Sequence, residues 1–347
     1  MNIDTIGWDI GGAHIKAVAT SGNGRIAAVA QHPCPLWRGL DRLDLALAEL
    51  ARTLPIQAAT THAVTMTGEL ADLFPDRCTG VRSLIDKFAD FCGAAHLLVF
   101  AGPHGLLPAK QLNDQQLEAI ASANWYAGGL WAARRLGSGL LIDVGSTTTD
   151  LIPFVDGEVA ARGYTDCERM RYDELVYSGI VRTPLMAIAR RIPFEGVWLS
   201  LMNEHFATTA DVYRLCGDLP EAADQHPTAD GAPKDRSFSA RRLARMIGRD
   251  AGSAPLSAWT RLAYSFRERQ TARIASAGEL QYSRPELTGN PPIIGAGVGR
   301  FLARAVASRL RLDYLDVDQL SPAIDGSSTF SVADCLPAAA VAELARQ

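Results

Sequence analysis

The sequence lacks a strong excess of charge of either sign. Its 34 Lys and Arg residues against 38 Asp and Glu give a formal net charge of −4, so charge gives no reason to expect nucleic acid or an anionic membrane as a partner. It also has no apolar run of the roughly 20 residues that a membrane span needs. The first residues, MNIDTIGWDIGG, lack the basic start and apolar core of a signal peptide. A cytoplasmic globular protein is the default expectation.

Paired metal-binding residues are also missing. The six cysteines are scattered without a CxxC pair, and the seven histidines form no HxxxH pair. This spacing argues against a zinc knuckle, a redox pair or a metal site made by protein side chains alone. The 347 residues are enough for two domains of ordinary size, each with its own core.

What the sequence does contain is a pattern of three short strands that occurs twice. Glycine turns join the strands in both sets. A duplicated half is the simplest explanation, with one lobe at 1–132, a second at 133–347 and a single helix over 114–135, bent at Gly128-Gly129, leading from one to the other. The first set of strands is expected at 3–10, 14–19 and 25–31, and the second at 139–143, 148–155 and 158–162.

The segment at about 164–285 differs from the two repeats. It is mostly helical in pattern and contains a polar run at 218–237 that is typical of a surface loop. We interpret this segment as an insertion in the second lobe that carries specificity. Four tryptophans are expected to be core or interface residues: Trp125, Trp131, Trp198 and Trp259.

The first motif that carries chemistry is the hairpin Gly7–Lys16. Gly11 and Gly12 let a phosphate oxygen approach the backbone, whose N–H groups can point at the anion. Asp9 ends the strand and suits Mg²⁺ bound through water, while Lys16 supplies a positive charge. Taken alone, the segment could equally be a plain hairpin with a glycine turn.

The second motif, Ile142–Asp150, repeats this spacing. Asp143 ends an apolar strand, and Gly145 follows two residues later, as Gly11 follows Asp9. Two independent hairpins would not explain the shared spacing, so we favour two phosphate-binding turns. Small hydroxyl residues and glycine complete the turn: Gly145, Ser146, Thr147 and Thr148.

The third motif is the glycine-rich turn at 295–299, between an expected strand and helix. Gly295 and Gly297 would leave N–H groups free at a helix N-terminus, where an anion is favoured. A GxGxG turn alone is a weak signal that also fits close packing. It lacks the rest of a dinucleotide-binding unit.

Other candidates lie outside these motifs. Glu69 follows a strand and a glycine, and it could be a general base, a second metal anchor or an early acidic residue of a helix. Within the insertion, polar residues suggest contacts with a substrate, although a lone histidine is more often structural. These residues are Arg182, Thr183, His205, Thr208 and Asp211.

The three phosphate motifs in this order resemble the actin-like ATPase superfamily, in its hydantoinase/oxoprolinase-related branch. Five segments resemble, more narrowly, the tetrahydromethanopterin-linked one-carbon pathway proteins, which include the condensing enzyme of methanofuran biosynthesis. The resemblance implies an α/β fold of two actin-like (RNase H-like) lobes, each with a three-stranded meander plus helices. The five segments are 7–16, 65–72 (TMTGELAD), 142–150, 181–184 (VRTP) and 205–215 (HFATTADVYRL).

The resemblance further implies a transferase. Such an enzyme joins an aminomethylfuran-methyl diphosphate to the phenol oxygen of a glutamylated tyramine, or of a tyrosine-like acceptor, and releases diphosphate. The expected cofactor is Mg²⁺, held by Asp9 and Asp143 directly or through water, which would stabilise the departing diphosphate. Glu69 is the first choice for the base that takes the phenolic proton, and Asp143 the second.

Two other functions remain open at this point. One is an ATP-dependent small-molecule kinase, or an ATP-coupled hydrolase of the hydantoinase/oxoprolinase type. The other is a scaffold protein that kept a degraded nucleotide fold, against which the intact Asp9, Asp143 and Lys16 argue. The sequence leaves open whether the chain forms a homo-oligomer.

Overall fold

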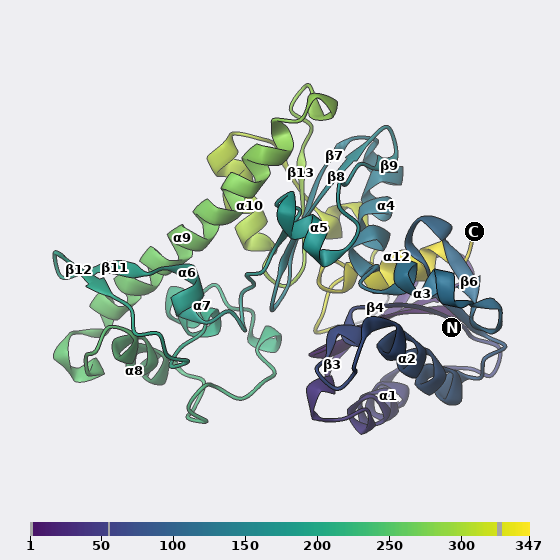
Figure 1. Cartoon of the computed structure of the whole chain (residues 1–347), viewed down its shortest axis with the longest axis horizontal. Helices are drawn as coiled ribbons and strands as arrows, with labels where there is room; N and C mark the ends of the chain where they lie inside the picture. The colour runs from purple at the N-terminus through teal and green to yellow at the C-terminus, as the bar shows by residue number, and fades with distance from the viewer. Residues whose placement is uncertain (1–2, 55, 325–327) are drawn as a thin grey trace. The chain divides into compact units, whose positions relative to one another are not determined.

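The chain folds into two units (Figure 1). The computed structural model describes residues 3–54, 56–324 and 328–347. The first unit consists of residues 1–138, 154–160 and 316–347, and the second of 139–153 and 161–315. The chain first passes from the first unit to the second after residue 138. The boundary expected from the sequence was at 132–133. The C-terminal residues 316–347 differ from expectation, because they belong to the first unit.

A six-stranded sheet forms the centre of the first unit. Its strands are β1 (Ile3–Ile10), β2 (His14–Ser21), β3 (Ile26–Pro33), β4 (Thr61–Met66), β5 (Leu97–Phe100) and β6 (Leu106–Pro108). They are arranged in the order β3-β2-β1-β4-β5-β6. The first three pair antiparallel, as the glycine turns predicted, while β4 pairs parallel to β1 and β5 parallel to β4.

Helices cover both faces of this sheet (Figure 1). Trp8 points to one face, where its ring meets Phe88 at a centroid distance of 5.2 Å. The neighbouring Gly7 points to the other face, where a Cβ would lie 1.9 Å from the carbonyl oxygen of Ala338. The C-terminal helix packs this closely because Gly7 has no side chain. The helices of this unit are α1 (Asp41–Thr53), α2 (Arg77–Cys92), α3 (Asp114–Ile120), α4 (Asn124–Leu136), α11 (Val317–Leu320) and α12 (Leu336–Leu344).

The expected single helix over 114–135 is two helices, so that prediction was wrong. Helix α3 ends at Ile120 and α4 begins at Asn124. Between them Ser122 has φ +53, a left-handed conformation that a continuing helix cannot contain. Gly128 and Gly129, the expected bend, lie buried inside α4.

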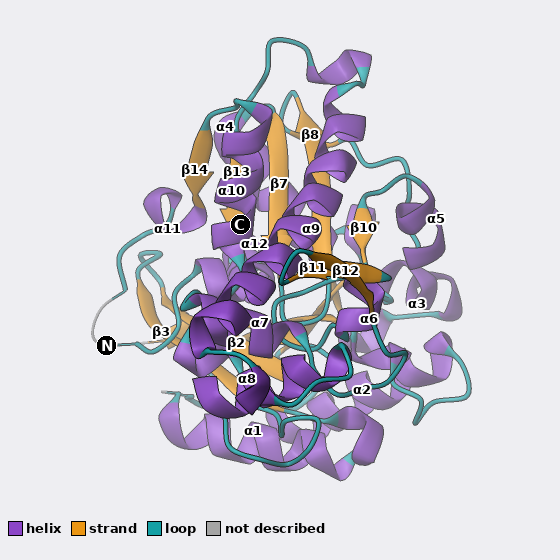
Figure 2. Ribbon diagram, turned by 90° about the vertical axis from the view of Figure 1, so that its left-hand side faces the viewer, coloured by secondary structure: helices purple, strands orange, loops and turns teal. Residues whose placement is uncertain are grey.

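The second unit contains a sheet with the order β10-β8-β7-β13-β14 (Figure 2). Strand β13 is parallel to β7, and helix α10 (Arg300–Leu310) follows it. The second meander is present, but its third strand is shorter than the expected 158–162. The strands of this sheet are β7 (Gly139–Val144), β8 (Thr149–Val155), β10 (Leu175–Val176), β13 (Ile293–Ala296) and β14 (Tyr314–Asp316), together with β9 (Glu158–Val159), whose residues fall in the first unit.

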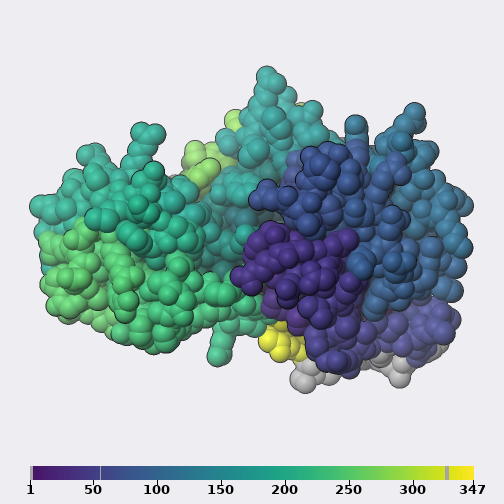
Figure 3. Space-filling model, turned by 60° about the horizontal axis from the view of Figure 1, so that its bottom comes forward, coloured from purple at the N-terminus to yellow at the C-terminus, as the bar shows by residue number. Residues whose placement is uncertain are grey.

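The insertion has a hydrophobic core of its own, in which the rings of Phe194 and Trp259 stack at 4.7 Å. Its surface forms one teal-to-green body in Figure 3. Trp198 is 55% exposed, so it is not a core residue, and it lies on a two-stranded hairpin that the sequence did not predict. The elements are α5 (Asp166–Arg171), α6 (Leu185–Ile188), β11 (Arg191–Phe194), β12 (Val197–Ser200), α7 (Thr209–Cys216), α8 (Arg236–Met246) and α9 (Leu256–Tyr282).

Within the described ranges, none of the helices has both the length and the apolar character required to cross a bilayer.

Candidate functional site

The β1–β2 hairpin has the backbone geometry that phosphate binding requires. The amide of Gly11 donates to the carbonyl of His14 at 2.9 Å, which closes a tight turn. A Cβ on Gly11 would lie 2.9 Å from that carbonyl oxygen, whereas one on Gly12 would meet nothing within 4 Å. Space beside Gly12 is therefore open to a ligand. Asp9 pairs in register with Lys16 across the two strands.

Asp9 and Glu69 follow neighbouring parallel strands. Strand β1 ends just after Asp9, and Glu69 lies in a short turn after β4, where the amide of Thr67 donates to the carbonyl of Ile10 at 2.9 Å. Both carboxylates are nearly inaccessible, at 5% and 1% exposure. Gly80 of α2 leaves room for Glu69, because a Cβ there would lie 2.9 Å from the Cβ of Glu69.

The break between α3 and α4 brings a polar partner to each of these carboxylates. The hydroxyl of Ser122 donates to Oε1 of Glu69 at 2.7 Å. The side-chain amide of Asn124 donates to Oδ1 of Asp9 at 3.3 Å. Sequence reasoning missed both residues because it placed them inside a continuous helix. The polar pair in an otherwise apolar stretch, ASANW at 121–125, was the available signal.

The β7–β8 turn of the second unit repeats the hydrogen bond of the first hairpin. The amide of Gly145 donates to the carbonyl of Thr148 at 2.9 Å, the same distance as from Gly11 to His14. Asp143 precedes this turn, and the hydroxyls of Ser146 and Thr147 lie 3.4 Å apart at its tip. The two hairpins therefore share both their sequence spacing and their backbone geometry.

Gly297 and Gly295 both allow close packing, against different neighbours. Gly297 has φ +80, and a Cβ on it would lie 2.4 Å from Oδ1 of Asp143. The absence of a side chain on Gly297 thus lets its backbone pack directly against that carboxylate. Gly295 is buried within β13, where a Cβ would lie 2.2 Å from the hydroxyl of Tyr314. The geometry of Gly295, which the sequence placed in the phosphate site, is that of a packing residue.

The segment 179–182 lies against the second hairpin. The amide of Ile180 donates to the carbonyl of Gly145 at 3.1 Å, and the amide of Arg182 donates to that of Ser146 at 2.9 Å. The exposed guanidinium of Arg182 contacts the hydroxyl of Thr147 at 3.4 Å. Arg182, expected to contact substrate, therefore lies at the tip of the hairpin and adds a positive charge there. The structure brings it together with Ser146 and Thr147.

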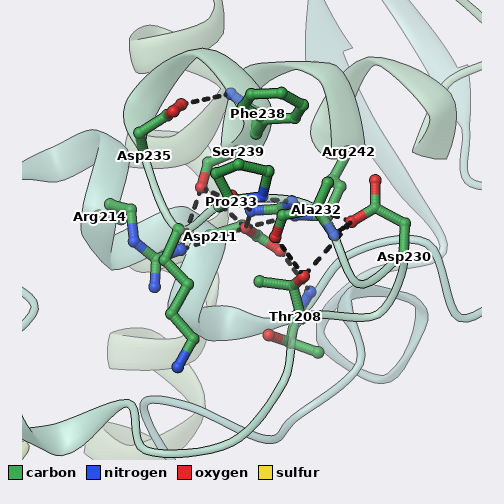
Figure 4. Close-up of polar contacts among 12 residues, drawn as sticks. Thr208, Asp211, Arg214, Asp230, Ala232, Pro233, Asp235, Phe238, Ser239 and Arg242 are labelled. Carbon is green, nitrogen blue, oxygen red and sulfur yellow. Dashed lines mark hydrogen bonds and ion pairs between the residues drawn. The ribbon is translucent and has the colours of Figure 1, made fainter.

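Thr208 and Asp211 have structural partners (Figure 4). Each side chain accepts from the backbone of the other residue, in a capping box that begins α7. The carboxylate of Asp211 also accepts from Nε of Arg242 and from the hydroxyl of Ser239, both at 2.8 Å. Arg242 is fully buried, so its positive charge requires this partner. These contacts join α7 to α8.

The other two candidates of the insertion also differ in position. The hydroxyl of Thr183 accepts from the amide of Gly179 at 2.8 Å and is buried. His205 is exposed and lies before α7. Thr183 therefore supports the backbone next to the second hairpin, whereas His205 is accessible from solvent.

A magnesium ion fits these hairpins only with help from water or phosphate oxygens. Within residues 3–54, 56–324 and 328–347, no three His, Cys, Asp or Glu side chains group closely enough to bind a metal. Asp9 and Asp143 each offer a hard oxygen ligand of the kind Mg²⁺ prefers. Thr65, the residue paired with Asp9 in register, has a buried hydroxyl with no hydrogen-bond partner in the described chain. The hydroxyl of Thr65, on the strand next to that of Asp9, suits a bound hydrated ion.

Comparison with known proteins gives a consistent result. The model of the hydantoinase/oxoprolinase family matches residues 60–336. A protein of Methanocaldococcus jannaschii, named (4-{4-[2-(gamma-L-glutamylamino)ethyl]phenoxymethyl}furan-2-yl)methanamine synthase, is 34% identical over 252 residues, which cover 72% of this chain and 73% of that protein. A protein of the same name from Methanococcus vannielii is 39% identical over 111 residues, 32% of this chain and 50% of that protein.

A solved structure supports the fold. Nucleotide-free acetone carboxylase covers 88% of this chain and 67% of that chain, with a TM-score of 0.56 at 10% identity. A likeness at this identity shows the fold alone. Together with the repeated hairpins, it confirms the two-lobed actin-like fold that the sequence predicted.

Proposed function

The chain belongs to the hydantoinase/oxoprolinase family, and we propose that it is the synthase that forms the aryl ether of a methanofuran-type cofactor. The observation that carries this proposal is its similarity, over most of both chains, to the Methanocaldococcus jannaschii synthase. The chain is therefore an enzyme of the transferase type. The kinase and hydrolase alternatives are not favoured by these relatives.

The name of the relatives' product defines the bond that is made. It contains a phenoxymethyl group that links a furan to the phenol of a glutamylaminoethyl side chain. Forming this ether requires the phenol oxygen to attack the furylmethyl carbon, while the bond from that carbon to its leaving group breaks. The acceptor is a γ-glutamyl tyramine or a tyrosine-like analogue of it.

Diphosphate is the leaving group that the two hairpins suit. Gly12 gives an anion access to the backbone of the first hairpin, and Lys16 adds a positive charge. In the second hairpin, the hydroxyls of Ser146 and Thr147 and the guanidinium of Arg182 are available to phosphate oxygens. Cations and oriented donors stabilise the negative charge that develops as diphosphate departs.

Magnesium would supply further stabilisation of the departing negative charge when it is bound. Asp9 in the first unit and Asp143 in the second are each candidates to hold it. Asn124 keeps the carboxylate of Asp9 oriented by donating to Oδ1. The absence of a side chain on Gly297 lets its backbone pack directly against the carboxylate of Asp143.

Glu69 is our candidate for the base that takes the phenolic proton, with Asp143 as the second candidate. The carboxylate of Glu69 accepts from Ser122, so its orientation is fixed before substrate binds. A base must lie within hydrogen-bond reach of the proton that it removes, and a fixed orientation makes that position reproducible. The phenolic proton passes to the carboxylate as the new carbon–oxygen bond forms.

Turnover of the purified chain tests this function. We would incubate it with Mg²⁺, an aminomethyl-furylmethyl diphosphate and γ-glutamyltyramine, and measure the ether by mass spectrometry and the released diphosphate by an enzymatic assay. We expect equal amounts of ether and diphosphate without ATP. Phosphorylation of a furan alcohol by ATP, with no ether from the diphosphate, would overturn the proposal in favour of a kinase.

A further inference from the structure

Gly179 links the insertion to the second hairpin. A Cβ on it would lie 2.4 Å from the amide nitrogen of Thr147 and 2.6 Å from the carbonyl oxygen of Gly145. Its backbone is thus packed directly on the hairpin that we assign to phosphate. A displacement of Gly179 by a few tenths of an ångström would be transmitted to that turn, because packed backbone has no space to absorb it.

The carbonyl of Gly179 is held from three sides. It accepts from the amide of Gln270 on α9 and from the hydroxyl of Thr209 on α7, both at 2.9 Å, and from the hydroxyl of Thr183 at 3.3 Å. One donor would satisfy a buried carbonyl. Donors from two helices of the insertion therefore fix where this carbonyl lies.

Gln270 is itself held in one orientation. It is 1% exposed, and its amide nitrogen also donates to the hydroxyl of Ser178 at 2.8 Å. Its amide oxygen accepts from the hydroxyl of Tyr213 on α7 at 2.6 Å. Burial raises the pKa of Tyr213, so this hydroxyl keeps its proton and remains a donor. The amide of Gln270 cannot rotate without losing all these contacts.

We propose that Gln270 is a positioning residue for the diphosphate site, through which the helical insertion sets the geometry of the hairpin Gly145–Thr148. Gln270 fixes Gly179, and Gly179 fixes the backbone beside Ser146, Thr147 and Arg182. This inference rests on the proposed function, because it takes that hairpin as the place where diphosphate binds. Gln270 does not need to touch the substrate.

A purely structural role would make Gln270 no different from another buried glutamine on the same helix. Gln281 provides that comparison. It is also 1% exposed on α9, and its amide nitrogen donates to the carbonyl of Tyr172 at 2.8 Å. Replacing either glutamine by methionine removes a buried amide at similar volume, so both variants should lose similar thermal stability. Only the change at Gln270 should affect anion binding.

The test is a calorimetric titration of the full chain with Mg²⁺-diphosphate. We expect Gln270→Met to weaken binding by roughly tenfold, the factor that corresponds to about one net buried hydrogen bond, and Gln281→Met to leave it unchanged. Tyr213→Phe removes only the hydroxyl that orients Gln270, and it should weaken binding by about threefold. This milder variant tests the inference even if Gln270→Met does not fold.

The outcomes separate this inference from the function on which it rests. Equal affinities for the unchanged chain, Gln270→Met and Tyr213→Phe would overturn the inference alone. Equal weakening in Gln270→Met and Gln281→Met would also overturn it, because the effect would then follow stability. An unchanged chain that does not bind diphosphate would overturn both. An unchanged chain that binds diphosphate but makes no ether would contradict the function, while a selective loss in Gln270→Met would still support the positioning role.

Discussion

At the scale of single residues, the first sheet buries a histidine in a specific state. His62 on β4 is 2% exposed, and the indole nitrogen of Trp8 donates to its Nδ1 at 3.0 Å. That nitrogen must therefore carry no proton, so the imidazole is neutral with its proton on Nε2. Burial, with a smaller contribution from the charge of His96, lowers the pKa of His62 from 6.5 to about 4.

The stability of the fold should therefore fall as the pH is lowered. Between pH 6.5 and about 4 the unfolded chain binds a proton at His62 that the folded chain does not, which favours unfolding. The full loss in the free energy of unfolding is on the order of 3 kcal/mol, since one pKa unit corresponds to about 1.4 kcal/mol. Chemical denaturation across this pH range measures it. His62→Gln should remove most of the pH dependence in this window, and an unchanged dependence would contradict the assignment.

Residue types alone predicted the glycines that form turns but not those that allow close packing. Gly11 and Gly145 were found because each follows an aspartate at a fixed spacing in a strand–turn sequence. Gly7 and Gly179 make closer contacts, with Ala338 and Thr147. Both partners are distant in the sequence from the glycines that they contact, so no local sequence pattern identifies them.

At the scale of elements, the break between α3 and α4 organises the carboxylates of the first unit. A continuous helix over 114–135 would have a single axis. Ser122 interrupts that helix, because its backbone adopts φ +53. Such a conformation is unfavourable for a residue with a side chain and persists where the surroundings require it. Here it places Ser122 beside Glu69 and Asn124 beside Asp9.

Replacing Ser122 by glycine should lower the rate of catalysis without lowering the stability of the fold. Glycine accepts a left-handed conformation more readily than serine, so the fold should be retained while the donor to Glu69 is lost. We expect kcat for ether formation to fall by about tenfold, with little change in the KM for the phenol. Steady-state kinetics together with thermal denaturation measure both effects.

Asn290→Gly is the matched control. Asn290 also has a left-handed backbone, with φ +52, but it is exposed and lies in the other unit. The Asn290→Gly variant should leave kcat for ether formation unchanged. A fall in kcat of the same size in both variants, or none in Ser122→Gly, would show that the contact between Ser122 and Glu69 does not serve catalysis.

Most elements could be predicted from sequence, but their breaks and pairings could not. The strands expected at 3–10 and 148–155 followed from the repeated pattern of short strands and turns, and β1 and β8 lie there. The α3–α4 break depends on contacts with β1 and with the turn after β4, which tertiary structure alone supplies. The same holds for Asp211, whose polar neighbourhood suggested a substrate contact but whose partners are Arg242 and Ser239.

At the scale of the whole molecule, the duplication visible in the sequence is the main organising feature. Each unit has an aspartate followed by a tight hairpin, with the same hydrogen bond at 2.9 Å. The division of the chain was harder to predict, because α12 returns to the first unit and packs on Gly7. An alanine-rich terminal helix gives little sign of which sheet it covers.

The origin of the ether oxygen tests the central claim most directly. We would supply γ-glutamyltyramine labelled with ¹⁸O in its phenol, together with an aminomethyl-furylmethyl diphosphate, Mg²⁺ and the purified chain without ATP. Attack by the phenol on the furylmethyl carbon predicts an ether that retains the label and diphosphate that contains none. Label in the released phosphate, or an ether that forms only when ATP is present, would contradict the account.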